Sequence, residues 1–121
     1  MNATVAFAIT GWDQQPYDES GEGPALSRAT VRKRFSGELD AESVAEVLIC
    51  GEAGYVASER VTGRLAGRAG TFVLQHGAAA HPDGSPFQFG NVVPGSGTGE
   101  LAGLSGTVVM EHELATLEYG F

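Results

Sequence analysis

Glycine interrupts this chain so often that no long regular helix fits between its breaks. Eighteen of the 121 residues are glycine, and the short segments between them are rich in Val, Thr, Phe and Tyr. Glycine destabilises the interior of a helix, whereas β-branched and aromatic residues favour pleated strands. No helical spacing of apolar residues is sustained anywhere along the chain. The sequence therefore predicts an all-β fold.

Eight segments have the composition of strands and recur at the spacing of sandwiches and barrels. They are Thr4–Trp12, Leu26–Gly37, Ser43–Cys50, Tyr55–Leu65, Thr71–Ala79, Phe87–Val93, Gly106–His112 and Ala115–Phe121. We predict a small antiparallel eight-stranded β-barrel, formed as a single domain over residues 1–121. The polar stretch Asp13–Pro24 is expected to be a flexible loop at the barrel mouth.

The charge balance bears on possible partners. Fifteen acidic and seven basic residues give a net charge of -8, which opposes binding to phosphate backbones and to anionic lipid. No apolar run approaches the roughly 20 residues that span a bilayer. The single cysteine, Cys50, cannot form an internal disulfide and suits a reducing compartment. We expect a cytoplasmic protein that binds neither nucleic acid nor membranes.

The turns between the central strands decide which side chains share a face, because a slip of one residue moves every side chain to the other face. We place turns at Glu38–Asp40 and at Arg68–Ala69. After the third strand two turns are possible, and the two-residue one would set Glu46 directly opposite Glu59. Like charges directly opposed destabilise a sheet, so electrostatics favour the three-residue turn Gly51–Ala53.

In this register one face is largely apolar and forms the interior. It holds Val31, Phe35, Val47, Ile49, Tyr55, Val61, Leu65, Phe72 and Leu74. Three polar residues share that face: Lys33, Glu59 and His76. Lys33 and Glu59 fall in one cross-strand row with only Ala45 between them, and His76 lies diagonal to Glu59. We predict that these three side chains converge inside the barrel.

The outer face of the third strand carries Val44 and Leu48 beside an expected charge cluster of Arg32, Glu46 and Arg60. Apolar residues grouped on a barrel exterior can mark a protein contact. We expect a homodimer or a larger homo-oligomer.

Metal and cofactor motifs are weak in this sequence. His76, His81 and His112 do not have the paired spacing of a zinc site, so we expect no metal. The glycine loop Gly95–Gly99 lacks the lysine of a P-loop, so we expect no phosphate site and no cofactor.

Five motifs resemble a known bacterial family over nearly the whole chain. They are Trp12-Asp13, Phe35–Leu39, Glu59–Gly63, Gly70–His76 and, above all, Val92–Leu101. With these motifs the chain resembles the domain of unknown function 3224 family. The resemblance implies an allene oxide cyclase barrel-like fold. Related barrels include enzymes that cyclise or isomerise apolar substrates in the interior and others that only bind.

Two functions follow as hypotheses. In the first, the chain is a cofactor-independent cyclase or isomerase of an apolar small molecule, with Glu59 and His76 as a general acid/base pair and Lys33 supporting the charge. The expected substrate-binding residues are Trp12, Phe35, Tyr55, Phe72 and Tyr119. In the second, the barrel binds a small ligand without turnover, and the polar residues anchor its carboxylate or hydroxyl. A further alternative is that Lys33 and Glu59 form a buried ion pair, capped by His76, that serves the fold alone.

Overall fold

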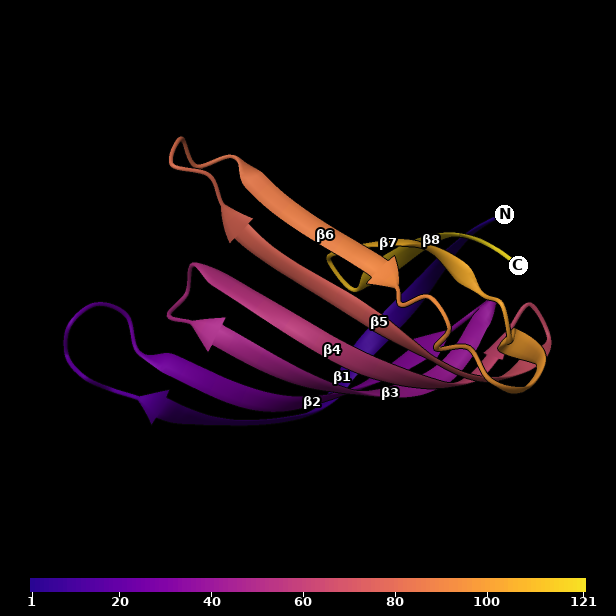
Figure 1. Cartoon of the computed structure of the whole chain (residues 1–121), viewed down its shortest axis with the longest axis horizontal. Coiled ribbons are helices and arrows are strands. Elements are labelled where there is room, and N and C mark those ends of the chain that lie inside the picture. The colour runs from indigo at the N-terminus through magenta and orange to yellow at the C-terminus, as the bar shows by residue number, and fades with distance from the viewer.

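The computed structural model describes all residues, Met1–Phe121. The strands are β1 (Asn2–Asp18), β2 (Leu26–Ser36), β3 (Leu39–Cys50), β4 (Gly54–Leu65), β5 (Arg68–Ala80), β6 (Pro86–Val92), β7 (Ser105–Glu111) and β8 (Leu114–Gly120), and a short 3-10 helix, η1, covers Gly99–Leu101. Every strand pairs antiparallel with the next, and β8 returns to β1 to close the barrel (Figure 1). The predicted antiparallel eight-stranded barrel is therefore confirmed. No helix in the structure has the length and apolarity needed to cross a membrane.

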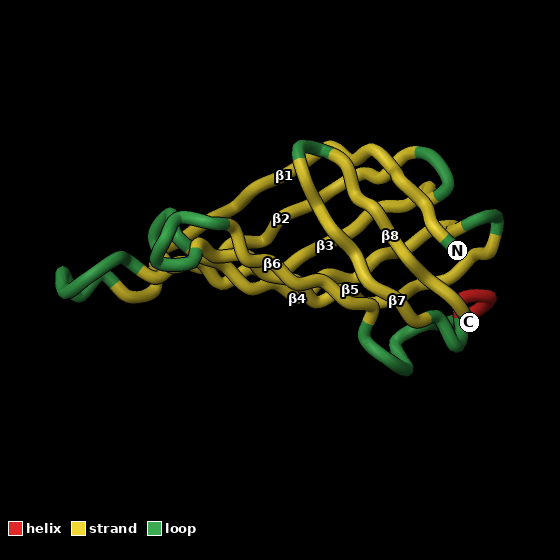
Figure 2. Tube along the Cα trace, turned by 90° about the horizontal axis from the view of Figure 1, so that it is seen from above, coloured by secondary structure: helices red, strands yellow, loops and turns green.

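The barrel is closed at one end and splayed at the other. The pairing between β1 and β8 is limited to Asn2–Ala6 of β1, and the pairing between β6 and β7 is limited to Asn91 and Thr107. The remaining lengths of β1–β6 continue past β7 and β8 as a curved sheet, as both views show (Figures 1 and 2). The molecule thus has a packed closed end and an open, concave end.

The first strand is longer than the sequence predicted. β1 continues through Asp13 to Asp18, where it still pairs with Leu26 of β2, so the predicted loop Asp13–Pro24 is wrong over residues 13–18. These residues are polar and exposed, and the ladder to β2 pairs the backbone groups along that edge of the strand. Only residues 19–25 connect the two strands.

The turn after β3 has the predicted three-residue form, and Ala45 lies opposite Glu59 as expected. The turn before β3 is tighter than predicted, with Gly37 at a φ of 122°, so Lys33 faces Ser43 instead of Ala45. This slip is two residues, and an even slip keeps every side chain on its predicted face.

The turn between β4 and β5 has the predicted two-residue length but lies two residues before the predicted position at Arg68–Ala69. It is centred on Ala66 and Gly67, with φ values of 50° and 83°. Two positive φ values match the two-residue hairpin turn that suits the twist of antiparallel strands. Val61 therefore pairs with Phe72 and not with His76, a slip of four residues that again preserves the faces.

The tighter turn before β3 also overturns the charge cluster that was predicted on the outer face. Val44, and not Glu46, lies between Arg32 and Arg60. Glu46 instead pairs with Arg28 at 3.4 Å, where both side chains are exposed.

The interior contains two apolar clusters separated by buried polar side chains. The larger cluster fills the closed end and contains Ala3, Val5, Phe35, Leu39, Ala41, Val61, Leu65, Phe72, Leu74, Val92, Leu101, Leu104, Val108, Ala115, Leu117 and Tyr119. The smaller one lies toward the open end and contains Ala29, Val31, Ala45, Val47 and Ala57, with Ile49 and Tyr55 packed against it. Between them are Lys33, Ser43, Glu59 and His76, which we call the polar layer.

Candidate functional site

The polar layer follows a diagonal across four neighbouring strands. Lys33 on β2 lies opposite Ser43 on β3. Glu59 on β4 lies two residues from the position opposite Ser43, and His76 on β5 lies two residues from the position opposite Glu59. Because strands in a barrel tilt against its axis, residues on such a diagonal lie at a similar height. The layer therefore crosses the interior between the two apolar clusters.

Glu59 is the centre of the layer and is completely buried. Its Oε1 lies 3.1 Å from Lys33 Nζ and 2.7 Å from His76 Nε2, and its Oε2 accepts a 2.5 Å hydrogen bond from Ser43 Oγ. No buried side-chain nitrogen or oxygen in the structure lacks a hydrogen-bond partner. The structure thus brings Lys33, Glu59 and His76 together, with Ser43 as a member that sequence reasoning missed.

The charge state of Glu59 results from opposing effects. Burial raises the pKa of this carboxyl, but the hydrogen bond from His76, the positive charge of Lys33 and the hydrogen bond from Ser43 together lower it from 4.5 to about 2. Glu59 is therefore an ionised acceptor at neutral pH and holds no proton to donate.

His76 connects Glu59 to a second hydroxyl group. Its Nδ1 lies 3.2 Å from Tyr55 Oη, and the two rings meet edge to face with centroids 5.7 Å apart. Because ionised Glu59 can only accept, His76 Nε2 must carry a proton. Burial and the nearby charge of Glu59 raise the pKa of Tyr55, so Tyr55 keeps its phenol proton. The three side chains form a continuous hydrogen-bonded chain, Tyr55–His76–Glu59.

Lys33 reaches the layer from β2 with its ammonium group directed inward. Its Nζ lies 3.7 Å from Met110 Sδ and 5.2 Å from the centroid of the Phe7 ring, in addition to its contact with Glu59. The ammonium group is thus held by one carboxylate and by softer contacts, which leaves part of its donor capacity free.

A cavity of about 890 Å³ lies on the concave side of the splayed sheet. Its polar lining includes Lys33, Tyr55 and His76, whereas Glu59 is not among the lining residues. Trp12 and Tyr55, two of the five predicted substrate-binding residues, line it. Phe7, Ile9, Val31, Val47, Ile49 and Met110 supply apolar wall.

The other three predicted substrate-binding residues lie elsewhere. Phe35, Phe72 and Tyr119 are buried in the larger cluster and are absent from the cavity wall. They point inward as predicted, but a close-packed interior leaves no space for a ligand beside them. Phe7 and Phe87 take their place among the aromatic residues of the wall. Phe7 points inward beside Phe35, whereas Phe87 has the same strand parity as the outward-facing Phe89 and lines both this cavity and the groove on the outer rim.

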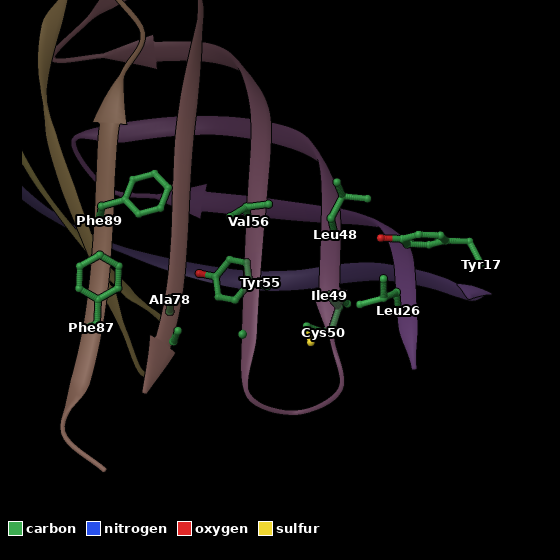
Figure 3. Close-up of a pocket in the computed structure, with 12 residues that line it drawn as sticks. Tyr17, Leu26, Leu48, Ile49, Cys50, Tyr55, Val56, Ala78, Phe87 and Phe89 are labelled. Atoms are coloured by element: carbon green, nitrogen blue, oxygen red, sulfur yellow. The ribbon is translucent and has the colours of Figure 1, made fainter. Parts of the chain in front are cut away.

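A shallower groove of about 340 Å³ runs along the outer rim of the open end (Figure 3). Leu48, Val56, Gly77 and Phe89 form one cross-strand row on this outer face. Leu48, Val56 and Phe89 are between 41% and 50% exposed. Gly77 leaves room for the Phe89 ring, because a Cβ there would lie 2.7 Å from a ring carbon. The row is a continuous apolar strip on the exterior.

The other histidines lie apart from the layer. His81 and His112 are exposed and follow the ends of β5 and β7. No group of three or more His, Cys, Asp or Glu residues is placed to hold a metal ion.

Comparison with known proteins shows the family of this chain and its similarity to solved structures. The family model described as protein of unknown function (DUF3224) matches residues 3–121. Among solved structures, a protein of unknown function from the DUF3224 family of Shewanella oneidensis MR-1 is similar to this chain, with a TM-score of 0.76 and 36% sequence identity. The similarity covers 98% of this chain and 94% of that one. A search of curated proteins gives no match.

Proposed function

Because this chain belongs to the DUF3224 family, which is described only as of unknown function, we propose from its own geometry that the barrel binds an apolar small molecule in the cavity beside the polar layer. The observation that carries the proposal is a cavity of about 890 Å³ with 14 hydrophobic residues among the 23 that line it. Ligand sites in proteins typically measure about 300–1,000 Å³ and combine apolar walls with a few polar groups. Lys33, Tyr55 and His76 are such groups here.

Filling the cavity tests this proposal. We expect Ile49→Trp, which adds bulk to the cavity wall, to weaken binding of the apolar dye Nile red by about tenfold or more, equivalent to about 1.4 kcal/mol. The matched control is Val109→Trp, because Val109 is 44% exposed on β7 and does not line the cavity. Equal dye affinities for the two variants, measured by fluorescence titration, would argue that the ligand site is elsewhere.

A second candidate function is cofactor-free cyclisation or isomerisation of the bound molecule. The chain Tyr55–His76–Glu59 favours it, because a hydroxyl, a base and an orienting carboxylate in sequence resemble the arrangement that activates catalytic hydroxyls. In this form of the hypothesis His76 exchanges the proton, ionised Glu59 stabilises the resulting imidazolium, and Lys33 stabilises a developing oxyanion. The allene oxide cyclase barrel-like fold and a cytoplasmic location belong to the same proposal.

We also propose that the protein forms a homodimer or a larger homo-oligomer through the apolar strip on its outer face. Light scattering at high micromolar concentration is expected to give at least twice the monomer mass. Leu48→Lys is expected to restore the monomer, because the new charge would be buried in the contact. Val109→Lys, with a similarly exposed position on β7, should leave the assembly intact, and a wild-type monomer would refute the proposal.

A further inference from the structure

The donor and acceptor capacity of each atom fixes where the protons lie in the hydrogen-bonded chain Tyr55–His76–Glu59. Glu59 accepts at Oε1, so the Nε2 proton of His76 points at it in every protonation state of the imidazole. When His76 is neutral, its Nδ1 has no proton and accepts the hydrogen bond from Tyr55. When His76 is protonated, Nδ1 donates instead, and Tyr55 Oη becomes the acceptor of that bond.

This reversal changes what Tyr55 offers to the cavity that it lines. With neutral His76, the phenol proton is used inside the chain, and only a lone pair of Tyr55 Oη is free. With protonated His76, the phenol proton is released and can be donated to a ligand. Lys33 Nζ is a donor in both states. The cavity therefore presents one donor and one acceptor in the first state, and two donors in the second.

The net charge of the layer changes with the same proton. Lys33 and ionised Glu59 cancel each other, so the layer is neutral when His76 is neutral and carries one positive charge when His76 is protonated. A hydroxyl group both donates and accepts and therefore complements the neutral layer. A carboxylate only accepts and is negative, so it complements the protonated layer.

We propose that protonation of His76 switches the ligand preference of the cavity from a hydroxyl to a carboxylate head group. Tyr55 transmits the change, because its hydroxyl group offers the ligand an acceptor in one state and a donor in the other. This inference rests on the proposed function, because it needs an apolar molecule in the cavity. The charged and titratable groups that contact His76 directly are Glu59 and Tyr55, both on β4. Lys33 on β2 shares the Glu59 oxygen, and the cross-strand partners Ala57 and Gly90 are uncharged.

Two ligands that differ only in the head group provide the test. Octanoate and octanol are titrated into the protein between about pH 5.5 and pH 8.5, a range in which a carboxylic acid with a pKa near 4–5 stays ionised. We expect octanoate to lose affinity by up to about tenfold per pH unit once free His76 loses its proton, because binding then requires uptake of that proton. Octanol affinity is expected to change by less than about twofold.

Variants and a reciprocal measurement locate the effect. His76→Gln keeps an N–H for Glu59 but cannot be protonated, so its octanoate affinity should not depend on pH. His112→Asn replaces an exposed histidine and should behave as the wild type. In the wild type, saturating octanoate should raise the NMR titration midpoint of His76, whereas octanol should not, because linkage between two binding events is reciprocal.

The outcomes separate the inference from the function on which it rests. Equal pH profiles for octanoate and octanol, or an unmoved His76 midpoint with octanoate bound, overturn the switch and leave the binding function in place. Failure of octanoate, octanol and Nile red to bind at any pH overturns the binding function and the switch together.

Discussion

Lys33→Ala is expected to lower the free energy of unfolding by about 3–5 kcal/mol, the usual cost of removing one partner from a buried ion pair. The variant leaves Glu59 completely buried and ionised with only His76 and Ser43 as partners. The penalty is therefore that of an uncompensated buried charge and not simply of a lost contact. Urea unfolding at neutral pH measures it as a lower midpoint at unchanged m-value.

The adjacent residue in the chain offers a matched control. Arg34 pairs with Asp40 on the exterior, where the two side chains are 45% and 57% exposed. Exposed pairs contribute roughly 0–1 kcal/mol, so Arg34→Ala should have little effect on stability. If Lys33→Ala were as mild as Arg34→Ala, the ion pair would not be what compensates Glu59.

The position of the polar layer supports our proposal that it does more than form a structural ion pair. Burying charges costs free energy, and well-packed apolar residues of similar size usually stabilise a fold as well or better. A purely structural pair could lie anywhere in the large cluster. Instead, Lys33, His76 and Tyr55 all reach the cavity wall, while Glu59 and Ser43 support them from behind. This arrangement favours a ligand-facing role.

The sequence predicted the strands and the faces well because alternation and glycine breaks carry that information. It misplaced two turns, because the conformation of Gly37 and of Ala66–Gly67 is decided by strand twist and not by local composition. Both register slips were even, so Glu59 and His76 remained diagonal neighbours despite the wrong pairing. The extension of β1 was missed because its residues are polar and exposed, and only the ladder to β2 holds them in a strand.

The site was predicted in part for a related reason. Alternation tells which side chains point inward but not how far along the barrel each one lies. Lys33, Glu59 and His76 were expected to converge and do. Phe35 and Phe72 share their face but lie on the closed side of the layer. Ser43 lies diagonal to Glu59 in the β3–β4 register, which was predicted correctly, so the face of Ser43 was known and only its contact with Glu59 was missed.

Glu59→Gln is the variant that separates the ion pair from the chemistry, since glutamine keeps the shape and an acceptor oxygen but not the charge. Its first expected effect is on acid stability. The pKa of Glu59 is lowered from 4.5 to about 2 in the folded protein, so the stabilisation is fully present above pH 4.5 and is lost as the pH falls toward 2. The wild type should lose about 3 kcal/mol over that window through this group. Glu59→Gln should lack that component of the acid dependence, which urea unfolding at several pH values would show.

The larger expected effect of Glu59→Gln is on proton transfer. If the cavity catalyses isomerisation, the wild type should accelerate deuterium exchange next to the carbonyl of an apolar ketone such as methyl hexyl ketone, followed by NMR in heavy water. Glu59→Gln should reduce that acceleration by about a hundredfold or more, because a neutral amide cannot stabilise the imidazolium that His76 forms on taking up the proton. Glu46→Gln, which alters an exposed carboxylate on the outer face, should retain full exchange. A Glu59→Gln protein that binds Nile red normally and exchanges as fast as the wild type would exclude Glu59 from proton transfer. The barrel would then be a binding protein, with its buried carboxylate serving to hold Lys33 and His76 in position.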